Sequence, residues 1–514
     1  MIPYRTLKVL LLAGLFSLPL SAQLMTGSIE GTVEDPSQAP IPGATVVLTH
    51  VATALQRKAE TSSLGEFEFN ALENGEYTLA ITKPGFKRVE KHNLVLDAGG
   101  RLPAGTIRLE LGQVSDTVTV QSQAVVVQTE SGDRSDVVTG SQVDTLAIRG
   151  RNITSLMQLL PGVVDTGTQD ALSETWTFNA LGGRTNTSNV TLDGATMNAI
   201  GNNSNGVVTL GMDAVAEVRV LLSNYEAAYG RKAGANVYLV SKSGTKDFHG
   251  LGSYFKRHEE LNANSFFNNQ ADVAKARYRY NTWNYNVGGP AYIPGVFNRN
   301  KEKLFFFWSQ EYWPSQTTTA LTQLTVPTAL ERQGNFSQSQ VGNALVVVKD
   351  PYNNGTPFAG NIIPTSRLNP SGLSLLTVFP SPNFTNTAVS KGQYNYIFQA
   401  PVQSPTRTET LKLDYHITSS DLLSVNFTHT PVESITAVGS PAPVSNWPRI
   451  KQDTLNNGHV VILQYRKILT PTLISETSVS YSWRPWNAIA DPADLKANQR
   501  NTVGLHGGAV QPFH

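Results

Sequence analysis

The sequence contains no cysteine in its 514 residues. A disulfide framework is therefore excluded, and the fold must be held by its own hydrophobic cores and hydrogen-bonded strands. Charged residues are also scarce, at 15% of the chain, which argues against wholesale disorder. The formal net charge is +1, from 40 basic and 39 acidic residues, so the charge balance gives no indication of a nucleic-acid partner.

Long hydrophobic runs are missing too. The first 22 residues combine basic Arg5 and Lys8 with an apolar run from Val9 to Leu20 and small residues after it, the pattern of a secretory signal peptide. This run is too short for a membrane helix, which needs about 20 apolar residues. No later segment is apolar for about 18 residues, so transmembrane helices are not expected, whereas the weaker signal of membrane β-strands stays compatible with the sequence.

Recognisable catalytic motifs are absent. His258 begins the stretch HEELN, but the zinc motif HExxH would need a second histidine where Asn262 stands. The 9 histidines are scattered, and the chain has no Gly-x-Ser-x-Gly nucleophile elbow. We therefore expect no enzymatic activity, no catalytic residue, no metal site and no cofactor.

The residues that are abundant favour β-structure. The chain has 41 glycines, 28 prolines and 9% aromatic residues, and its length predicts more than one domain. In residues 27–111, apolar side chains recur at every second position, as in Phe67 and Phe69, between turns such as Asn74-Gly75. The spacing of these turns predicts an all-β sandwich.

This region also resembles a known family. The stretch GSIEGTVEDPSQAPIPGATVVLTH and its continuation to PGFK are similar to the carboxypeptidase-regulatory-like domain, a β-sandwich with a carbohydrate-binding-like fold that precedes many exported bacterial proteins. A shared fold does not imply a shared activity, so the family name alone predicts no peptidase.

A linker at residues 112–129 follows the sandwich. It contains DTVTV, which resembles the energy-coupling box of TonB-dependent outer membrane transporters. The resemblance implies that a TonB-type energising complex binds here, with the segment adding a strand to the partner's sheet. The alternating threonines and valines fit equally well the last strand of the sandwich, and both interpretations remain open. The candidate box comprises Asp116, Thr117, Val118, Thr119 and Val120.

Residues 130–248 carry three further stretches in a specific order. A short helix is predicted at Ile153–Leu160, ended by Pro161-Gly162. It is followed by FNALGGRTNTSNVTLDGATMN and by MDAVAEVRVLLSNYEAAYGRKAGANVYLVSKSGT. In this order the stretches are similar to the α+β plug domain of Oar-like TonB-dependent receptors.

A plug inside a polar lumen should be tied to the wall by polar and charged contacts, because a large apolar interface would prevent its removal. The resemblance implies pairs between plug arginines and acids of the wall. A solvated turn arginine is the alternative interpretation, for Arg231 in particular. The candidates are Arg149, Arg184, Arg231 and Glu311.

From residue 249 to 514 the pattern becomes that of longer amphipathic strands. In TWNYNVGG, Trp283 and Tyr285 alternate with Asn284 and Asn286, which predicts aromatic side chains toward lipid and amides toward the lumen. Two hairpins follow, and residues 314–407 are expected to form a long extracellular loop. A soluble two-sheet β-protein would show the same alternation, so periodicity alone favours the membrane barrel only slightly.

The predicted fold class is thus mainly β: an N-terminal sandwich, an α+β plug, and the first part of an antiparallel transmembrane β-barrel. About 22 strands are needed around a plug, and the sequence provides roughly seven, so we expect an incomplete N-terminal portion. The family resemblance covers residues 27–485.

The expected function is that of an exported receptor in the outer membrane lipid, which binds an extracellular ligand and transports it into the periplasm. A siderophore, an oligosaccharide and a peptide all remain open as ligands. The alternative is a surface adhesion or carbohydrate-binding protein in which the sandwich is the working domain.

Overall fold

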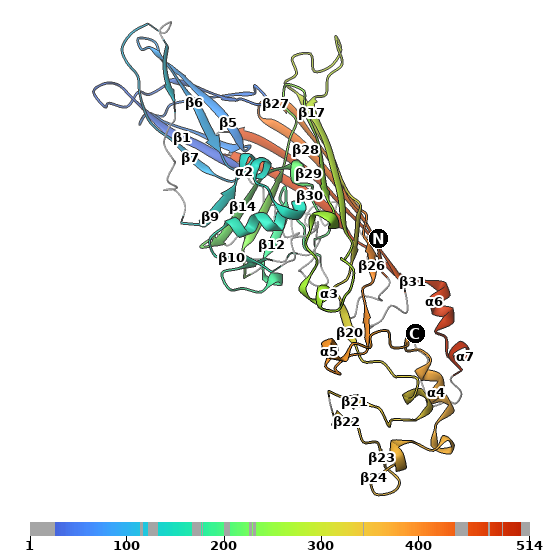
Figure 1. Cartoon of the computed structure of the whole chain (residues 1–514). Helices are drawn as coiled ribbons and strands as arrows, with labels where there is room; N and C mark the ends of the chain where they lie inside the picture. The colour runs from blue at the N-terminus through green and yellow to red at the C-terminus, as the bar shows by residue number, and fades with distance from the viewer. Residues whose placement is uncertain are drawn as a thin grey trace, which may run out of the picture.

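The computed structural model describes residues 26–113, 117–121, 132–166, 176, 178–199, 206–225, 229, 233–342, 344–436, 451–470, 473–485 and 487–504. The predicted signal peptide lies outside them. Figure 1 shows a blue sandwich, a teal and green plug, and a wall of long strands coloured green to red. No described helix is both long enough and apolar enough to cross a membrane.

The N-terminal part is a two-sheet sandwich, as predicted. One sheet has the order β4-β1-β7 and the other β3-β2-β5-β6-β8. Buried side chains alternate with exposed ones at the start of β4 and with half-buried ones along β5, because successive residues of a strand point to opposite faces. The strands are β1 (Gly27–Glu34), β2 (Thr45–His50), β3 (Gln56–Glu60), β4 (Glu66–Leu72), β5 (Gly75–Thr82), β6 (Arg88–Leu96), β7 (Arg101–Arg108) and β8 (Thr117–Gln121).

The plug is built on a sheet of order β13-β12-β15-β14-β9, with a β10-β11 ribbon beside it. All residues of β15 are buried, because the strand lies inside the sheet between β12 and β14. The elements are β9 (Arg134–Val138), α2 (Gly140–Thr145), η1 (Arg149–Arg151), η2 (Ile153–Leu159), β10 (Val163–Asp165), β11 (Phe178–Ala180), η3 (Thr185–Thr187), β12 (Asn189–Leu192), β13 (Ala195–Thr196), η4 (Met212–Ala214), β14 (Val215–Ser223) and β15 (Asn236–Ser241).

The helix predicted at Ile153–Leu160 is present as the 3₁₀ helix η2. Asn152 caps its start, where the side chain accepts a hydrogen bond from Thr154 N–H, and Gly162 adopts a left-handed φ of 85° just beyond its end. A short segment that opens with isoleucine, threonine and serine has low α-helix propensity, and 3₁₀ geometry is common in pieces of this length.

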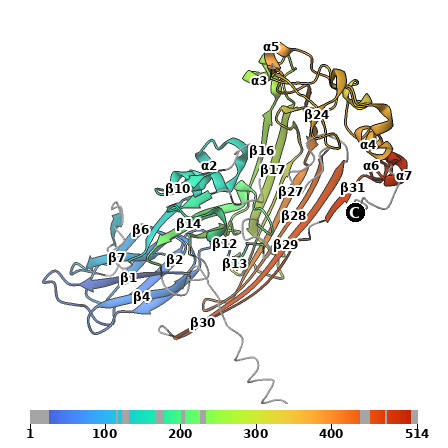
Figure 2. The same ribbon diagram turned by 90° about the horizontal axis from the view of Figure 1, so that it is seen from below.

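The wall is a sheet of ten strands with the order β26-β19-β17-β18-β27-β28-β29-β30, to which β16 and β31 add through β17 and β29. Figure 2 shows the plug lying beside the strands of this wall. Asn284 and Asn286 are buried and Trp283 and Tyr285 exposed, so the predicted alternation is present. The strands are β16 (His249–Arg257), β17 (Tyr278–Pro290), β18 (Leu304–Trp313), β19 (Ser315–Thr318), β26 (Pro401–Gln403), β27 (Thr406–Thr418), β28 (Asp421–Thr436), β29 (Gln452–Thr470), β30 (Leu473–Trp483) and β31 (Asn487–Ala490).

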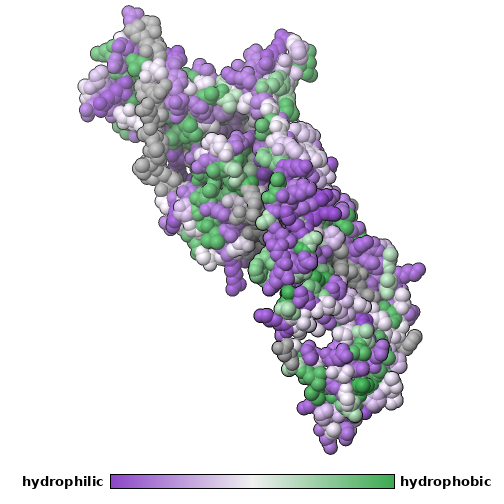
Figure 3. All heavy atoms as spheres, in the orientation of Figure 1, coloured by the Kyte–Doolittle hydropathy of each residue, from purple (hydrophilic) through white to green (hydrophobic). Residues whose placement is uncertain are grey.

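The segment 314–407 lies at the end of the wall that is remote from the sandwich (Figures 1 and 2). In the face that Figure 3 shows, hydrophobic and hydrophilic residues are mixed over this region. Short elements replace long strands here and at the C-terminal end: η7 (Glu331–Gln333), η8 (Ala359–Asn361), η9 (Thr365–Arg367), α4 (Pro370–Leu376), α5 (Thr387–Ser390), β20 (Thr322–Leu324), β21 (Gln340–Val341), β22 (Ala344–Leu345), β23 (Lys349–Asp350), β24 (Thr356–Pro357), β25 (Tyr396–Phe398), α6 (Pro492–Ala497) and α7 (Arg500–Val503); η6 (Glu259–Leu261) and α3 (Phe266–Gln270) lie between β16 and β17.

Candidate functional site

A cluster of buried charges joins the plug to the wall. Arg151 of the plug donates from Nε to Glu311 Oε1 of β18 at 2.8 Å, and its Nη2 lies 2.6 Å from Asp213 Oδ2. Glu311 is fully buried, and the Arg151 guanidinium also lies 4.4 Å from the ring centre of Phe255 on β16. An unpaired carboxylate at this depth would be costly, so Glu311 depends on the plug for its countercharge.

Two side chains of the wall also donate hydrogen bonds to Asp213 of the plug. Asn284 on β17 donates from Nδ2 to Asp213 Oδ2 at 2.6 Å, and Ser253 on β16 donates to the same oxygen at 3.3 Å. Asp213 belongs to the plug, in η4 directly before β14. Its carboxylate is therefore shared between Arg151 and two polar side chains of the wall.

The predicted site residues have different places in this arrangement. Glu311 lies at the centre of the cluster, but the arginine that meets it is Arg151. The side chain of Arg149 and all of Arg231 lie outside the described residues. Arg184 is exposed on the plug surface. The Arg-Gly-Arg sequence around Gly150 marks Arg151 as a second candidate, whereas nothing in the pattern singles out Asp213.

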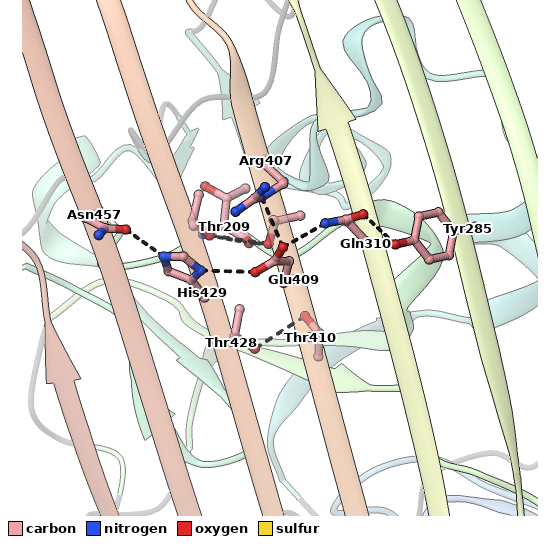
Figure 4. Close-up of polar contacts among 11 residues, drawn as sticks. Thr209, Tyr285, Gln310, Arg407, Glu409, Thr410, Thr428, His429 and Asn457 are labelled. Carbon is pink, nitrogen blue, oxygen red and sulfur yellow. Dashed lines mark hydrogen bonds and ion pairs between the residues drawn. The ribbon is translucent and has the colours of Figure 1, made fainter.

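A threonine cluster forms a second contact between plug and wall. Thr209 of the plug accepts a hydrogen bond at its carbonyl oxygen from the Thr408 hydroxyl of β27 at 2.6 Å. Its N–H donates to the Thr430 hydroxyl of β28 at 3.0 Å. Thr209 is the member of this cluster that is labelled in Figure 4. Backbone groups of the plug thus find their partners on side chains of the wall.

A third contact surrounds the turn between β12 and β13. Asp193 accepts from Asn426 Nδ2 of β28 at 2.6 Å and lies 3.7 Å from Lys412 Nζ of β27. Its carbonyl oxygen accepts from Gln464 Nε2 of β29 at 2.6 Å. Inside the plug, Ser241 at the end of β15 donates to the Asp193 carboxylate at 2.5 Å. One turn of the plug therefore engages three adjacent wall strands.

The opposite face of the same strands also carries a polar row. Glu409 of β27 lies 3.0 Å from Arg407 Nε and 3.1 Å from His429 Nδ1, and it accepts from Gln310 Nε2 at 2.7 Å. Figure 4 shows this row continuing to Tyr285 and to Asn457 across neighbouring strands. Because each polar group has a partner within the row, the cost of placing it on a face that also carries exposed aromatic residues is reduced.

The sandwich is attached to the plug by a pair of charged residues on β14. Glu217 accepts from Ala98 N–H at 2.6 Å, and Arg219 donates from Nη1 to Ala98 O at 2.6 Å. Asn74 donates to the second carboxylate oxygen of Glu217 at 3.2 Å. Glu217, Arg219 and Ala98 are 6%, 5% and 1% exposed. We call this contact the Ala98 clamp.

Burial raises the pKa of Glu217 to about 7, and the nearby Asp97 carboxylate adds to the rise, whereas the Ala98 N–H, Asn74 and Arg219 oppose it. Burial also raises the pKa of Asp97. Both shifts favour the neutral carboxyl group in the docked state.

The candidate coupling segment lies on the sandwich. Thr117–Gln121 forms β8, which pairs in parallel with β6 so that Thr119 lies opposite Glu90. Val118 packs against the sandwich core. Asp116 lies outside the described residues. This position agrees with the interpretation of the segment as the last sandwich strand, and its role in coupling stays a prediction.

Replacing Arg151 with methionine should weaken the seating of the plug, because Asp213 and Glu311 would remain as two buried carboxylates without a countercharge. We expect a loss of roughly 3–5 kcal/mol, measured as the urea dependence of carbodiimide labelling at Glu311 by mass spectrometry. Arg184→Ala, on the exposed surface, is the control and should stay within about 0.5 kcal/mol. Equal effects of the two changes would contradict the assignment of Arg151.

Gly458→Ala on β29 should displace the plug locally, because a Cβ at this position would overlap the carbonyl oxygen of Val207. We expect a cost of about 1–3 kcal/mol, seen as faster hydrogen exchange at Thr209 N–H. The matched control is Gly252→Ala on β16, where a Cβ meets nothing within 4 Å. If Thr209 N–H is protected from exchange equally well in the Gly458 variant, Gly458 and the carbonyl oxygen of Val207 are not in tight contact.

The Ala98 clamp should weaken as the pH rises. The folded-state pKa of Glu217 lies above its ordinary value of 4.5, so its contribution is complete below about pH 4.5 and is lost as the pH passes 7. The whole effect amounts to roughly 3 kcal/mol at most. Hydrogen exchange at Ala98 N–H, corrected for its intrinsic pH dependence, should become faster between pH 5 and pH 8, and the fall in the free energy of opening should be close to this amount. Glu217→Gln should remove most of this pH dependence. A wild-type profile that is flat would refute the linkage.

Three matches to known families cover the three parts of the chain. Residues 28–110 match the carboxypeptidase regulatory-like domain, residues 128–237 the TonB-dependent receptor plug domain, and residues 240–514 the outer membrane beta barrel domain. The last match alone covers more than half of the chain. These matches confirm the predicted order of sandwich, plug and barrel strands.

Individual relatives are similar over part of their length. The TonB-dependent transporter Oar of Myxococcus xanthus is 26% identical over 241 residues, which is 45% of this chain and 22% of the relative. The outer membrane transporter YddB of Escherichia coli has a TM-score of 0.42 and 11% identity, covering 68% of this chain and 38% of that chain. Pseudomonas aeruginosa FpvA, solved with heterologous pyoverdines, has a TM-score of 0.37 and 13% identity, covering 72% and 44%.

The chain thus spans less than half the length of each of these relatives. Because the TM-scores are low, the assignment rests on the family matches, which agree with the plug and wall found in the structure. This chain belongs to the outer membrane β-barrel family and has the domain order of a TonB-dependent receptor with an N-terminal carboxypeptidase-regulatory-like domain.

Proposed function

We propose that this protein acts as a TonB-dependent receptor, which binds an extracellular ligand and lets it pass when a TonB-type complex pulls on the coupling segment. The observation that carries the proposal is the polar attachment of the plug. The contacts of Arg151, Thr209 and Asp193 with the wall are ion pairs and hydrogen bonds. Water can replace such partners, so breaking these contacts does not itself expose apolar surface.

Apolar packing across this interface supports the same role. Phe307, Val460 and Ile462 of the wall belong to the hydrophobic cluster whose other members lie in the plug. These residues hold the plug against the wall by apolar packing, while the polar contacts, which are directional, fix its position. A plug of this kind is stable at rest and removable under force.

The orientation follows from the same proposal. The sandwich and coupling segment face the periplasm, where a TonB-type complex acts, and the region 314–407 at the other end of the wall faces the exterior. The outward side chains of the wall meet outer membrane lipid, and the signal peptide at residues 1–22 directs export. Siderophore, oligosaccharide and peptide remain the candidate ligand classes.

Removal of Asp116–Val120 tests the coupling role. The full chain and the deletion variant are compared for binding of the purified carboxyl-terminal domain of TonB from the same host, by isothermal calorimetry. We expect binding by the full chain and at least a tenfold loss in the variant, because the partner's sheet would have no strand to pair with. Thr119→Ala keeps the backbone and should bind normally.

Hydrogen exchange along β6 shows whether the sandwich stays folded after the deletion. Unchanged TonB binding with the segment removed would mean that coupling does not use these residues. No binding by the full chain would instead favour the surface adhesion or carbohydrate-binding role.

A further inference from the structure

We infer that the N-terminal sandwich and the plug form one body, and that the sandwich closes one end of the wall and leaves it together with the plug. The sandwich has two neighbours, the plug and the wall. Its contact with the plug consists of direct buried hydrogen bonds, whereas a cavity interrupts its contact with the wall, and this difference determines which neighbour it follows.

The contact with the plug is buried and directional. In the Ala98 clamp, a carboxylate and a guanidinium hold both polar groups of one peptide segment, and all three participants are almost fully buried. Hydrogen bonds from the charged Arg219 guanidinium are stronger than those between neutral groups, and leaving either buried side chain without a partner is unfavourable. Lys246, shortly after β15, adds a backbone hydrogen bond to Ala52 of the sandwich at 3.0 Å.

The contact with the wall is interrupted by a cavity. A cavity of about 370 Å³ lies where sandwich, plug and wall meet, enough for on the order of ten water molecules. Its lining is rich in ionisable groups, which water can solvate once the parts separate. These groups include His50 and Glu73 of the sandwich and Lys412, Asp414, His416 and Arg466 of the wall. A hydrogen bond from Thr26 to Glu476 of β30, at 3.1 Å, bridges sandwich and wall beside it.

The position of the clamp links it to β8. Ala98 comes two residues after the end of β6, and β6 is the strand that pairs with β8. Force applied to Thr117–Gln121 would therefore reach β14 of the plug through β6 and the clamp. This consequence rests on the proposed function, whereas the inference that sandwich and plug move together does not.

The absence of cysteine makes the inference directly testable, because two introduced thiols can pair only with each other. Thr26→Cys with Glu476→Cys ties the sandwich to the wall. Ala52→Cys with Lys246→Cys ties it to the segment that follows β15 of the plug, leaves the Ala98 clamp intact, and serves as the matched control. Opening of the plug is read in the full chain as carbodiimide labelling of Glu311 with increasing urea.

Oxidation of the Thr26–Glu476 pair should move Glu311 labelling to higher urea, and reduction should restore the original midpoint. Oxidation of the Ala52–Lys246 pair should leave the midpoint within error, because those parts already move together. A plug that opens at the same urea concentration with and without the wall tether would overturn the inference, since it could then leave while the sandwich stays behind.

A second measurement needs no engineered bond. In the unmodified chain, labelling of Glu311 should begin at lower urea than labelling of Glu217, because both are buried and only Glu311 is uncovered when sandwich and plug leave the wall together. The reverse order would mean that the sandwich separates from the plug first, which also overturns the inference. Neither measurement depends on TonB or on a ligand, so a failure here would leave the proposed transport function standing.

Discussion

The structure depends on one electrostatic constraint, the need to neutralise a fully buried carboxylate inside a β-sheet wall. Glu311 receives its countercharge from Arg151, which belongs to a different part of the chain. The wall therefore reaches its stable form only with the plug in place, and the plug is in turn held by groups that water can replace. Polar side chains at Asn284 and Thr408 extend the same principle over the inner face. Contacts that are deeply buried and yet polar are compatible with the proposed release of the plug.

The two faces of the wall have different neighbours, although the same strands provide both. On β27, Thr408 turns to the plug and Glu409 to the other side, because neighbouring residues of a strand point in opposite directions. The outer row around Glu409 shows that even ionisable groups are accepted there when they are paired with one another. The sandwich extends this organisation beyond the wall through the Ala98 clamp, which joins it to the plug strand that follows Asp213.

Much of the fold could be predicted because its signals are local. The two predicted hairpins are present as β27–β28 and β29–β30, and the alternation of Trp283 and Asn284 gives the correct faces of β17. The 3₁₀ form of η2 could not be predicted, because hydrophobic spacing does not distinguish a short 3₁₀ helix from an α-helix. Of the candidate site, the wall residue Glu311 was among the predicted residues, but its partner Arg151 was not. The plug carries several arginines, and only the packing of plug against wall selects Arg151.

The sequence by itself determined the order of sandwich, plug and amphipathic strands, the absence of disulfides, and the polar side of wall strands such as β17, because these follow from composition and from the period of two along a strand. Only the tertiary structure decided which charges meet. Arg151 with Glu311, Glu217 with Ala98, and β8 with β6 are contacts between segments that are separated in the chain. Such pairings depend on how whole domains dock, and no local pattern of residues encodes that geometry.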